Sequence, residues 1–402
     1  MAPEFAPSIM ENYADVLIWA MQMARKEKFR SGDIVLIRFD NPALELAEIL
    51  YEKLIDRRMQ VLCRMTPTAR MEQSFYRGAV NRQLTFLPPG EKTLMEELNG
   101  SIYLHAPQSL THLEQVDSRK IGKTMVARKE LRDILVRREE QGLFGWTLCS
   151  FPTPEPARQA NLSERRYARQ IIRACFLDHD DPVAQWKRVF REAGHIKRWL
   201  NAMDVRSCHV ESDGTDLIIT PGENRKWIGV SGHNIPSFEL FLSPDWRGTR
   251  GVYFADQPSF RSGNYVSGAR LVFEKGVVTS ASANDGESFL KKQIALDSGA
   301  KKVGEFSLTD RRFSVIDTFM ANTLFDENYG GRHGNCHIAL GSSYSDTYDG
   351  DPAELTKERK KSLGFNESSL HWDLVNREAK TVTAHLSSGK RVVIYENGAF
   401  TL

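Results

Sequence analysis

The fold class is decided by two neighbouring stretches near the start of the chain, ENYADVLIWAMQMARKEKF (residues 11–29) and SGDIVLIRF (residues 31–39). Apolar residues of the first stretch recur at the three- and four-residue spacing of an amphipathic helix, whereas the second is a short apolar run after a glycine turn. A second helical pattern, PALELAEILYEKLIDRR (residues 42–58), leads into the strand-like MQVLCRM (residues 59–65). Strands that alternate with helices predict an α/β domain with a largely parallel sheet.

Two further apolar runs, SIYLHA (residues 101–106) and GWTLCSF (residues 145–151), extend this predicted sheet. A long helix is expected after them, beginning with Asp181 and Pro182, because this pairing is typical of a helix start. We place the end of the N-terminal α/β domain close to the end of that helix, so that the domain comprises residues 1–204.

Beyond residue 204 the pattern changes to short alternating strands separated by glycine turns. These strands lie in residues 207–220, 248–255, 268–283 and 380–402. Such a pattern predicts antiparallel hairpins, and one helical stretch, GESFLKKQIALDSG (residues 286–299), interrupts them. The C-terminal domain, residues 205–402, is therefore expected to be of the mixed α+β class.

The bulk properties exclude several classes of protein. The chain has 402 residues, which favours two domains over a single core. Its net charge of +2 lacks the basic excess of a nucleic-acid binder. The five cysteines are scattered without a CxxC pair, which favours a reducing compartment over a disulfide framework. Because there is neither a basic leader nor an apolar run of about 20 residues, we expect a cytoplasmic protein with no membrane partner.

Residue types that bind metals concentrate in the expected C-terminal domain. Glu239 lies in HNIPSFELFLSP and Glu305 in KVGEFSL, while SLHWDLV contains His371 and Asp373. His371 and Asp373 are two residues apart on an expected strand, so both project from one face and can bind the same ion. Imidazole and carboxylate ligands suit Zn, Co, Mn or Fe. The N-terminal half has no glycine-rich nucleotide motif, so a nucleotide is not expected there.

A fourth segment, FDENYGGRHGNCHIALGSSY (residues 325–344), contains two candidate histidines. His333 follows two glycines in a flexible loop, which is a poor platform for a metal ligand. His337 lies in CHIALG, where a regular element is expected to hold it firmly. We therefore expect His337 rather than His333 to bind the metal.

Five sequence blocks resemble the aminopeptidase T/aminopeptidase S family of dinuclear metalloaminopeptidases. In chain order they are NIPSFELFLSP, VGEFSL, TLFDEN, HIALGSSY and LHWDLV. In the first half, GWTLCSFPTPEPARQANLS and LDHDDPVAQW are also similar to family signatures. The resemblance implies six metal ligands, which are Glu239, Glu305, Glu327, His337, His371 and Asp373. It further implies that Glu305 bridges two ions and that Tyr344 is a catalytic residue beside them.

The same resemblance implies a metal-dependent aminopeptidase that hydrolyses the N-terminal residue from peptides with a free N-terminus. Two divalent ions (Zn, Co or Mn), about 3.5–4 Å apart, would activate a shared water. The hydroxyl of Tyr344 would donate a hydrogen bond to the oxyanion of the tetrahedral intermediate. The resemblance also implies a homodimer in which the N-terminal domain limits access to the site.

Two other functions stay open at this point. The first is a mononuclear non-haem iron ring-cleaving dioxygenase on the same scaffold, because His337, His371 and Asp373 form the two-histidine, one-carboxylate donor set of such enzymes. The presence of three further glutamates at ligand positions favours two metals instead. The second is a binding or structural protein that keeps the fold without catalysis, although none of the six ligand positions has been lost.

Overall fold

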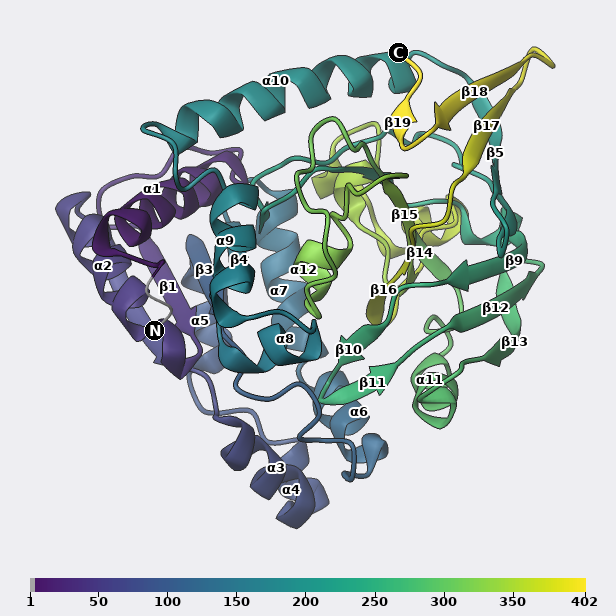
Figure 1. Ribbon diagram of the computed structural model, residues 1–402. Coiled ribbons are helices and arrows are strands. Elements are labelled where there is room, and N and C mark those ends of the chain that lie inside the picture. The colour runs from purple at the N-terminus through teal and green to yellow at the C-terminus, as the bar shows by residue number, and fades with distance from the viewer. Residues whose placement is uncertain (1–3) are drawn as a thin grey trace. The chain divides into compact units, whose positions relative to one another are not determined.

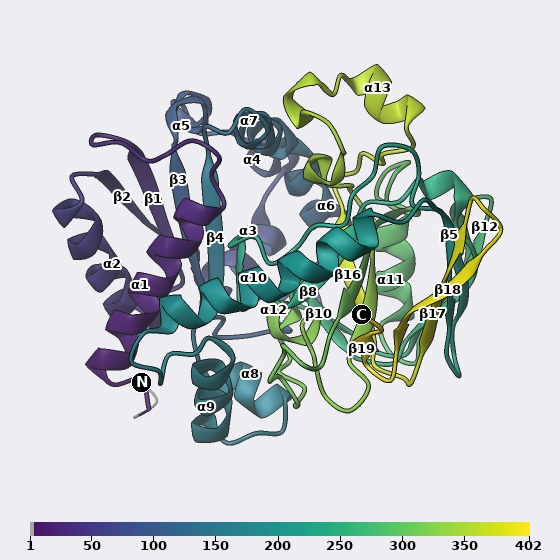
Figure 2. The ribbon, with the colours of Figure 1, turned by 90° about the horizontal axis from the view of Figure 1, so that it is seen from above.

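The computed structural model describes residues 4–402 and divides into two compact units (Figure 1, Figure 2). The first unit comprises Met1–Arg188 and Val230–Ser237, and the second comprises Val189–Gly229 and Phe238–Leu402. Helix α10 (Pro182–Asn201) begins in the first unit and ends in the second. The domain boundary placed at residue 204 from the sequence stays a prediction.

The first unit contains a five-stranded parallel sheet in the order β2-β1-β3-β4-β7, which confirms the predicted α/β class. Its strands are β1 (Ile34–Phe39), β2 (Gln60–Met65), β3 (Gly100–His105), β4 (Gly145–Ser150) and β7 (Asn234–Ile235). Its helices are α1 (Pro7–Met23), α2 (Leu44–Asp56), α3 (Ala69–Gly78), α4 (Asn81–Leu84), α5 (Glu91–Glu97), α6 (Ser118–Ala127), α7 (Lys129–Glu140), α8 (Pro154–Gln159) and α9 (Glu164–Ala174).

Helices cover both faces of this sheet, which explains why its strand β1 is almost continuously apolar. Leu36 of β1 packs with Leu98, Phe144 and side chains of α5 and α7. Val35 and Ile37 alternate with Leu36 and are fully buried on the opposite face, where α1 and α2 contact the sheet (Figure 2). The helical spacing of apolar residues in residues 11–29 therefore corresponds to the face of α1 that packs on the sheet.

Asp40 ties together the carboxyl ends of three strands of this sheet. Its carboxylate accepts hydrogen bonds from the Thr66 hydroxyl, from Tyr103 Oη at 3.2 Å and from the Ala106 N–H at 2.7 Å. The Nδ1 atom of His105 lies 3.2 Å from the same carboxylate. Burial alone would raise the pKa of Asp40, but the contacts with His105, Thr66 and Ala106 hold it below its usual value.

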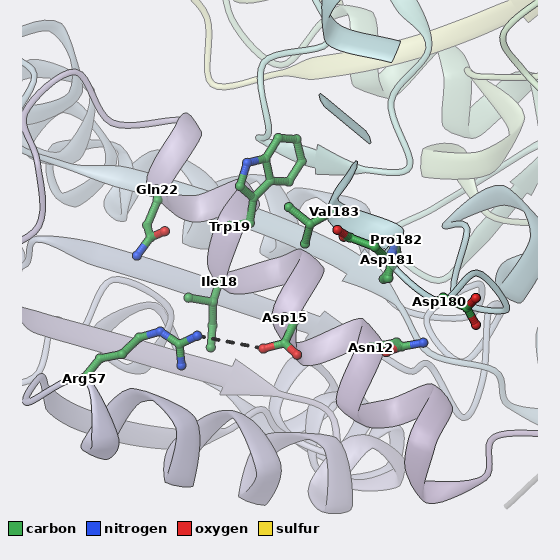
Figure 3. A pocket seen from close by; sticks show the side chains of 10 residues that line it. All are labelled: Asn12, Asp15, Ile18, Trp19, Gln22, Arg57, Asp180, Asp181, Pro182 and Val183. Atoms are coloured by element: carbon green, nitrogen blue, oxygen red, sulfur yellow. Dashed lines mark ion pairs between the residues drawn. The ribbon is translucent and has the colours of Figure 1, made fainter. Parts of the chain in front are cut away.

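A polar pocket of about 330 Å³ lies between α1 and the start of α10 in the first unit (Figure 3). Two of its aspartates already have partners: Asp15 lies 3.8 Å from Arg57, and Asp181 accepts the N–H of Ala184 at 2.8 Å. The second of these contacts confirms that the Asp-Pro pair starts a helix, as predicted. Within residues 4–402, the group of side chains arranged to hold a metal ion lies elsewhere, in the second unit.

The second unit contains two antiparallel sheets, in agreement with the mixed α+β class expected from the sequence. The eight-stranded sheet has the order β13-β12-β9-β6-β5-β17-β18-β19, and the four-stranded sheet has the order β16-β15-β14-β8. The strands of the larger sheet are β5 (Val205–Glu211), β6 (Asp216–Ile219), β9 (Arg250–Ala255), β12 (Ala269–Glu274), β13 (Val277–Ser282), β17 (Thr381–Leu386), β18 (Arg391–Glu396) and β19 (Ala399–Phe400). Those of the smaller sheet are β8 (Glu239–Leu242), β14 (Val303–Thr309), β15 (Asn335–Gly341) and β16 (His371–Asn376).

The remaining elements of this unit are short. They are the hairpin of β10 (Ser259–Arg261) with β11 (Asn264–Val266) and the helices α11 (Glu287–Ile294), α12 (Thr323–Asp326) and α13 (Lys357–Ser362), together with the 3₁₀ helices η2 (Trp246–Gly248), η3 (Ser345–Thr347) and η4 (Pro352–Glu354). Within residues 4–402, no helix is both long and apolar enough to cross a membrane.

Candidate metal centre

The four-stranded sheet carries five of the six predicted metal ligands on one of its faces. Within β14, Glu305 and Ser307 alternate with residues that point to the opposite face. Ser307 lies opposite His337 of β15. Glu305 lies opposite Ala339 of β15, and Ala339 lies opposite Asp373 of β16. Residues opposite each other in neighbouring strands share a face, so Glu305, His337 and Asp373 converge.

Glu239 and His371 join the same face at its edges. Glu239 opens β8 and pairs with Thr309, which lies on the same face of β14 as Ser307 and Glu305. His371 lies two residues before Asp373 on β16, so the same-face geometry expected for this pair is present in the strand. Its Nδ1 atom lies 3.0 Å from the carbonyl oxygen of Ser342, which leaves Nε2 to face the carboxylates.

The side chains meet at short distances. Glu239, Glu305 and His337 each offer a ligand atom within 4.8 Å of the others, and all three are buried. The Nε2 atom of His337 lies 3.2 Å from Glu239 Oε2 and 3.2 Å from Glu305 Oε1. On the other side, His371 Nε2 lies 3.6 Å from Glu305 Oε2 and 3.4 Å from Asp373 Oδ1. The two oxygens of Glu305 therefore face two different histidines.

Glu327 reaches the group from outside the sheet, at the end of α12. Its carbonyl oxygen accepts hydrogen bonds from Thr309 Oγ1 at 3.2 Å and from Asn335 Nδ2 at 3.0 Å. Its side chain is buried, and desolvation followed by the charges of Glu239 and Asp373 raises its pKa well above the usual range. Glu327, the third residue of FDEN (residues 325–328), is therefore close to the carboxylates, although it is not part of the compact group of Glu239, Glu305 and His337.

Tyr344 and His333 have very different surroundings. The ring of Tyr344 stands edge-on to His371 at 4.8 Å, and its N–H donates to Ser243 Oγ at 2.8 Å. Desolvation and the carboxylates of Glu305 and Asp373 raise the pKa of Tyr344 well above 10. His333 lies in the loop before β15, where desolvation and then basic side chains, Arg332 first, lower its pKa.

Burial and mutual repulsion dominate the electrostatics of the group. Desolvation, reinforced by Glu305 and Asp373 and opposed by His337, raises the pKa of Glu239 to about 7. Desolvation alone would lower the pKa of each histidine, but neighbouring carboxylates raise it to about 9 in both His337 and His371. Burial alone would raise the pKa of Asp373, but His371 and His337 outweigh it and lower that pKa to about 2.

The donor set fits divalent metal ions. Four carboxylates and two imidazoles converge here, and burial together with mutual repulsion raises the pKa of Glu239 and of Glu327, so the charged form of these two side chains is disfavoured. A buried charge without a counterion costs several kcal/mol, and a divalent cation bound between the side chains would remove that cost. Carboxylate oxygen and imidazole nitrogen are the ligands preferred by Zn, Mn and Co.

The family comparison agrees with this chemistry. The family model described as thermophilic metalloprotease (M29) matches residues 7–400. The chain belongs to this metalloprotease family. M29 membership confirms the resemblance that the ordered blocks predict, as well as the enzyme class and the requirement for a divalent metal.

Characterised relatives of the M29 chain cover most of its length. It is 28% identical over 308 residues to aminopeptidase T of Thermus aquaticus, which covers 72% of this chain and 74% of that protein. It is 29% identical over 329 residues to aminopeptidase 2 of Geobacillus stearothermophilus, covering 76% and 77% of the two chains. None of these relatives supports the alternative iron dioxygenase.

The fold also has a solved counterpart. Wild-type AmpT from Thermus thermophilus matches with a TM-score of 0.76 at 23% identity, covering 97% of this chain and 100% of that one. At this level of identity the match supports the fold alone, and it agrees with the parallel and antiparallel sheets described above.

Two polar contacts shape the centre, and sequence reasoning missed the first of them. Ser307 Oγ donates to Glu239 Oε2 at 2.9 Å from a fully buried position. Asn328 Oδ1 accepts the N–H of Phe238, and Asn328 Nδ2 donates to the carbonyl of Leu324. The Asn328 side chain therefore connects the residue just before β8 to helix α12. Ser307 lies two residues after Glu305, and that same-face spacing was a signal available in the sequence.

Proposed function

We propose that this M29 chain is a metal-dependent aminopeptidase that hydrolyses the N-terminal residue from peptides. The observation that carries the proposal is the position of Glu305, whose Oε1 and Oε2 atoms face His337 and His371 respectively. A carboxylate with its two oxygens turned toward two separate imidazoles is suited to bridging two ions. The relatives named aminopeptidase T and aminopeptidase 2 support the exopeptidase activity.

In this proposal six side chains would hold two divalent ions. The ligands are Glu239, Glu305, Glu327, His337, His371 and Asp373. When bound, such ions lower the pKa of water and polarise a carbonyl as Lewis acids. The donor types are compatible with Zn, Co and Mn alike, so the choice of native metal rests on measurement.

The metal-binding chemistry of the centre explains why a free N-terminus is the expected substrate end. Divalent ions held by the six side chains would offer a binding position to the free α-amine of a peptide. An internal peptide bond offers no such amine, because its nitrogen belongs to an amide. The residues of the centre would therefore orient a peptide with its first residue over the site.

Tyr344 is assigned the role of hydrogen-bond donor in catalysis. A tyrosine hydroxyl is protonated at neutral pH, so that it can donate to an oxyanion. The edge-on contact with His371 and the hydrogen bond from its N–H to Ser243 fix the ring beside the ligands. Preorganised donors of this kind are what transition-state stabilisation requires.

The proposal also includes a cytoplasmic homodimer. The five cysteines are free thiols, four of them buried, which supports a reducing compartment. Edge strand β2 exposes Leu62 at 41% and Met65 at 48%, and an apolar sheet edge of this kind is suited to covering by a second copy. Sedimentation equilibrium at micromolar concentration tests the dimer.

The activity is tested with chelator-treated protein supplied with Co²⁺, Mn²⁺ or Zn²⁺ and leucine p-nitroanilide. We expect hydrolysis only with added metal. N-acetyl-leucine p-nitroanilide is the matched control, because it differs only in lacking the free amine, and we expect no turnover of it. Equal hydrolysis of the two anilides would contradict an aminopeptidase, and no hydrolysis with any metal would contradict a peptidase of this kind.

A further inference from the structure

An aromatic side chain shares the sheet face of the metal centre without being able to bind metal. Phe241 lies two residues after Glu239 on β8, so the two side chains project to the same side. Its partner on β14 is Ser307, whose own hydroxyl donates to Glu239. Phe241 is only partly buried, whereas Leu240 and Leu242 on the other face of β8 are 1% exposed. Its ring therefore borders the centre and contacts solvent.

Phe241 and Tyr344 together form an apolar wall. Their ring centroids lie 5.8 Å apart with an interplanar angle of 60°, and Tyr344 in turn contacts His371. Tyr344 is 37% exposed, which is unusual for a large ring beside buried charges. The wall thus presents ring surface toward solvent directly beside the ligand side chains.

The backbone holds this wall rigidly. The N–H of Phe241 donates to the carbonyl of Ile228 and its carbonyl accepts the N–H of Ile228, both at 2.9 Å. Ser243, two residues further along, receives the N–H of Tyr344. Both ends of the wall are therefore fixed from the same short segment, and a rigid apolar surface can discriminate between ligands by shape.

We propose that Phe241 determines specificity, because its ring and the exposed face of Tyr344 receive the side chain of the N-terminal residue and select a bulky apolar one. This inference rests on the proposed aminopeptidase function. With the free α-amine held at the metal centre, the first side chain must lie next to the ligand side chains. Toward Glu327 and Asp373 it would cover polar carboxyl groups, which costs free energy, whereas toward Phe241 it covers ring carbon.

A competing role for Phe241 is to support the ring of Tyr344. That role predicts a different pattern, because a misplaced Tyr344 slows every substrate equally and changes kcat rather than the preference among substrates. Selection by Phe241 changes kcat/KM for large side chains and leaves small ones nearly unaffected. The two roles are separated by comparing leucine and alanine p-nitroanilides.

We expect the wild-type enzyme to prefer the leucine over the alanine substrate by at least about tenfold in kcat/KM, the usual worth of a few methylenes in an apolar pocket. In Phe241→Ala this ratio should fall by about tenfold, with turnover of the alanine substrate within about threefold of wild type. Phe241→Leu, which keeps an apolar side chain at the position, should give an intermediate ratio. The matched control is Phe254→Ala, which removes a partly buried phenylalanine from the eight-stranded sheet and should leave the ratio unchanged.

Binding of the non-hydrolysable amino alcohols leucinol and alaninol, measured by calorimetry, tests the wall without turnover. A leucinol preference that is lost in Phe241→Ala supports the inference even if no anilide is hydrolysed, in which case only the proposed function fails. An unchanged leucine-to-alanine ratio in Phe241→Ala, or an equal loss on both substrates, overturns the inference while the aminopeptidase function stands.

Discussion

The hydroxyl of Ser307 offers the sharpest test of how the fold supports the metal centre. Ser307 is fully buried, and its Oγ atom donates to Glu239 Oε2 at 2.9 Å. Ser307→Ala removes this hydrogen bond and almost no volume, so the sheet should keep its packing. The predicted effect is therefore on Glu239, which loses the donor that orients its carboxylate.

The size of the effect follows from the type of bond. A hydrogen bond to a charged group contributes about 1.5–3 kcal/mol, and leaving a buried carboxylate oxygen without its donor costs a similar amount. Since about 1.4 kcal/mol corresponds to a factor of ten in affinity, metal binding should weaken about 10- to 100-fold. Losses of this order are typical when a residue that orients a metal ligand is removed.

The assay is calorimetric titration of Mn²⁺ or Co²⁺ into chelator-stripped protein. Ser212→Ala is the matched control, because it also deletes a serine–carboxylate hydrogen bond, from Ser212 Oγ to Glu378 Oε2 at 2.6 Å, but outside the metal centre. We expect its metal affinity to stay within about threefold of wild type. If Ser307→Ala binds metal as tightly as Ser212→Ala does, then Glu239 is not a ligand oriented by this contact.

Three further predictions concern the centre and the first unit. Glu305→Ala should abolish hydrolysis and lower the metal content measured by mass spectrometry, since a bridging carboxylate serves both ions, and full activity in this variant would exclude bridging. Tyr344→Phe should lower kcat at least about 100-fold with the metal content intact, because it removes one oxyanion donor, and wild-type turnover would exclude that role. Asp40→Asn should lower the free energy of unfolding at pH 7 by about 1–3 kcal/mol, measured by denaturant titration. Because the pKa of Asp40 is lowered in the folded state, its stabilisation is present above the unfolded pKa near 3.9 and is lost as the pH falls through the folded pKa. The difference in stability between Asp40→Asn and wild type should therefore vanish in acid. A difference that does not change with pH would contradict this prediction.

The sequence predicted most of the parallel sheet because its strands are short apolar runs placed between helical patterns. The apolar runs that contain Leu36 and Ile102 correspond to β1 and β3, and the Asp181–Pro182 pair marks the start of α10. The same-face spacing of His371 and Asp373 could likewise be deduced from strand geometry alone. Local patterns of this kind need no knowledge of which strand pairs with which.

What the sequence could not provide is the register between strands. Glu239 faces Glu305 only because β8 pairs with β14 so that Glu239 lies opposite Thr309, and no local signal specifies this pairing. Glu327 approaches through hydrogen bonds from Thr309 and Asn335, which depend on the same long-range arrangement. The two-residue spacing of Glu239 and Phe241, which places both side chains on one face of a strand, is visible in the sequence. The contact between the rings of Phe241 and Tyr344 is not, because it depends on the fold.

The most direct test of the central claim is the number of divalent metal ions bound per chain after purification without chelators. We predict two ions per chain in the wild-type protein, with hydrolysis of leucine p-nitroanilide lost when they are removed and restored when they are returned. One iron per chain, or full hydrolysis by metal-free protein, would contradict the account.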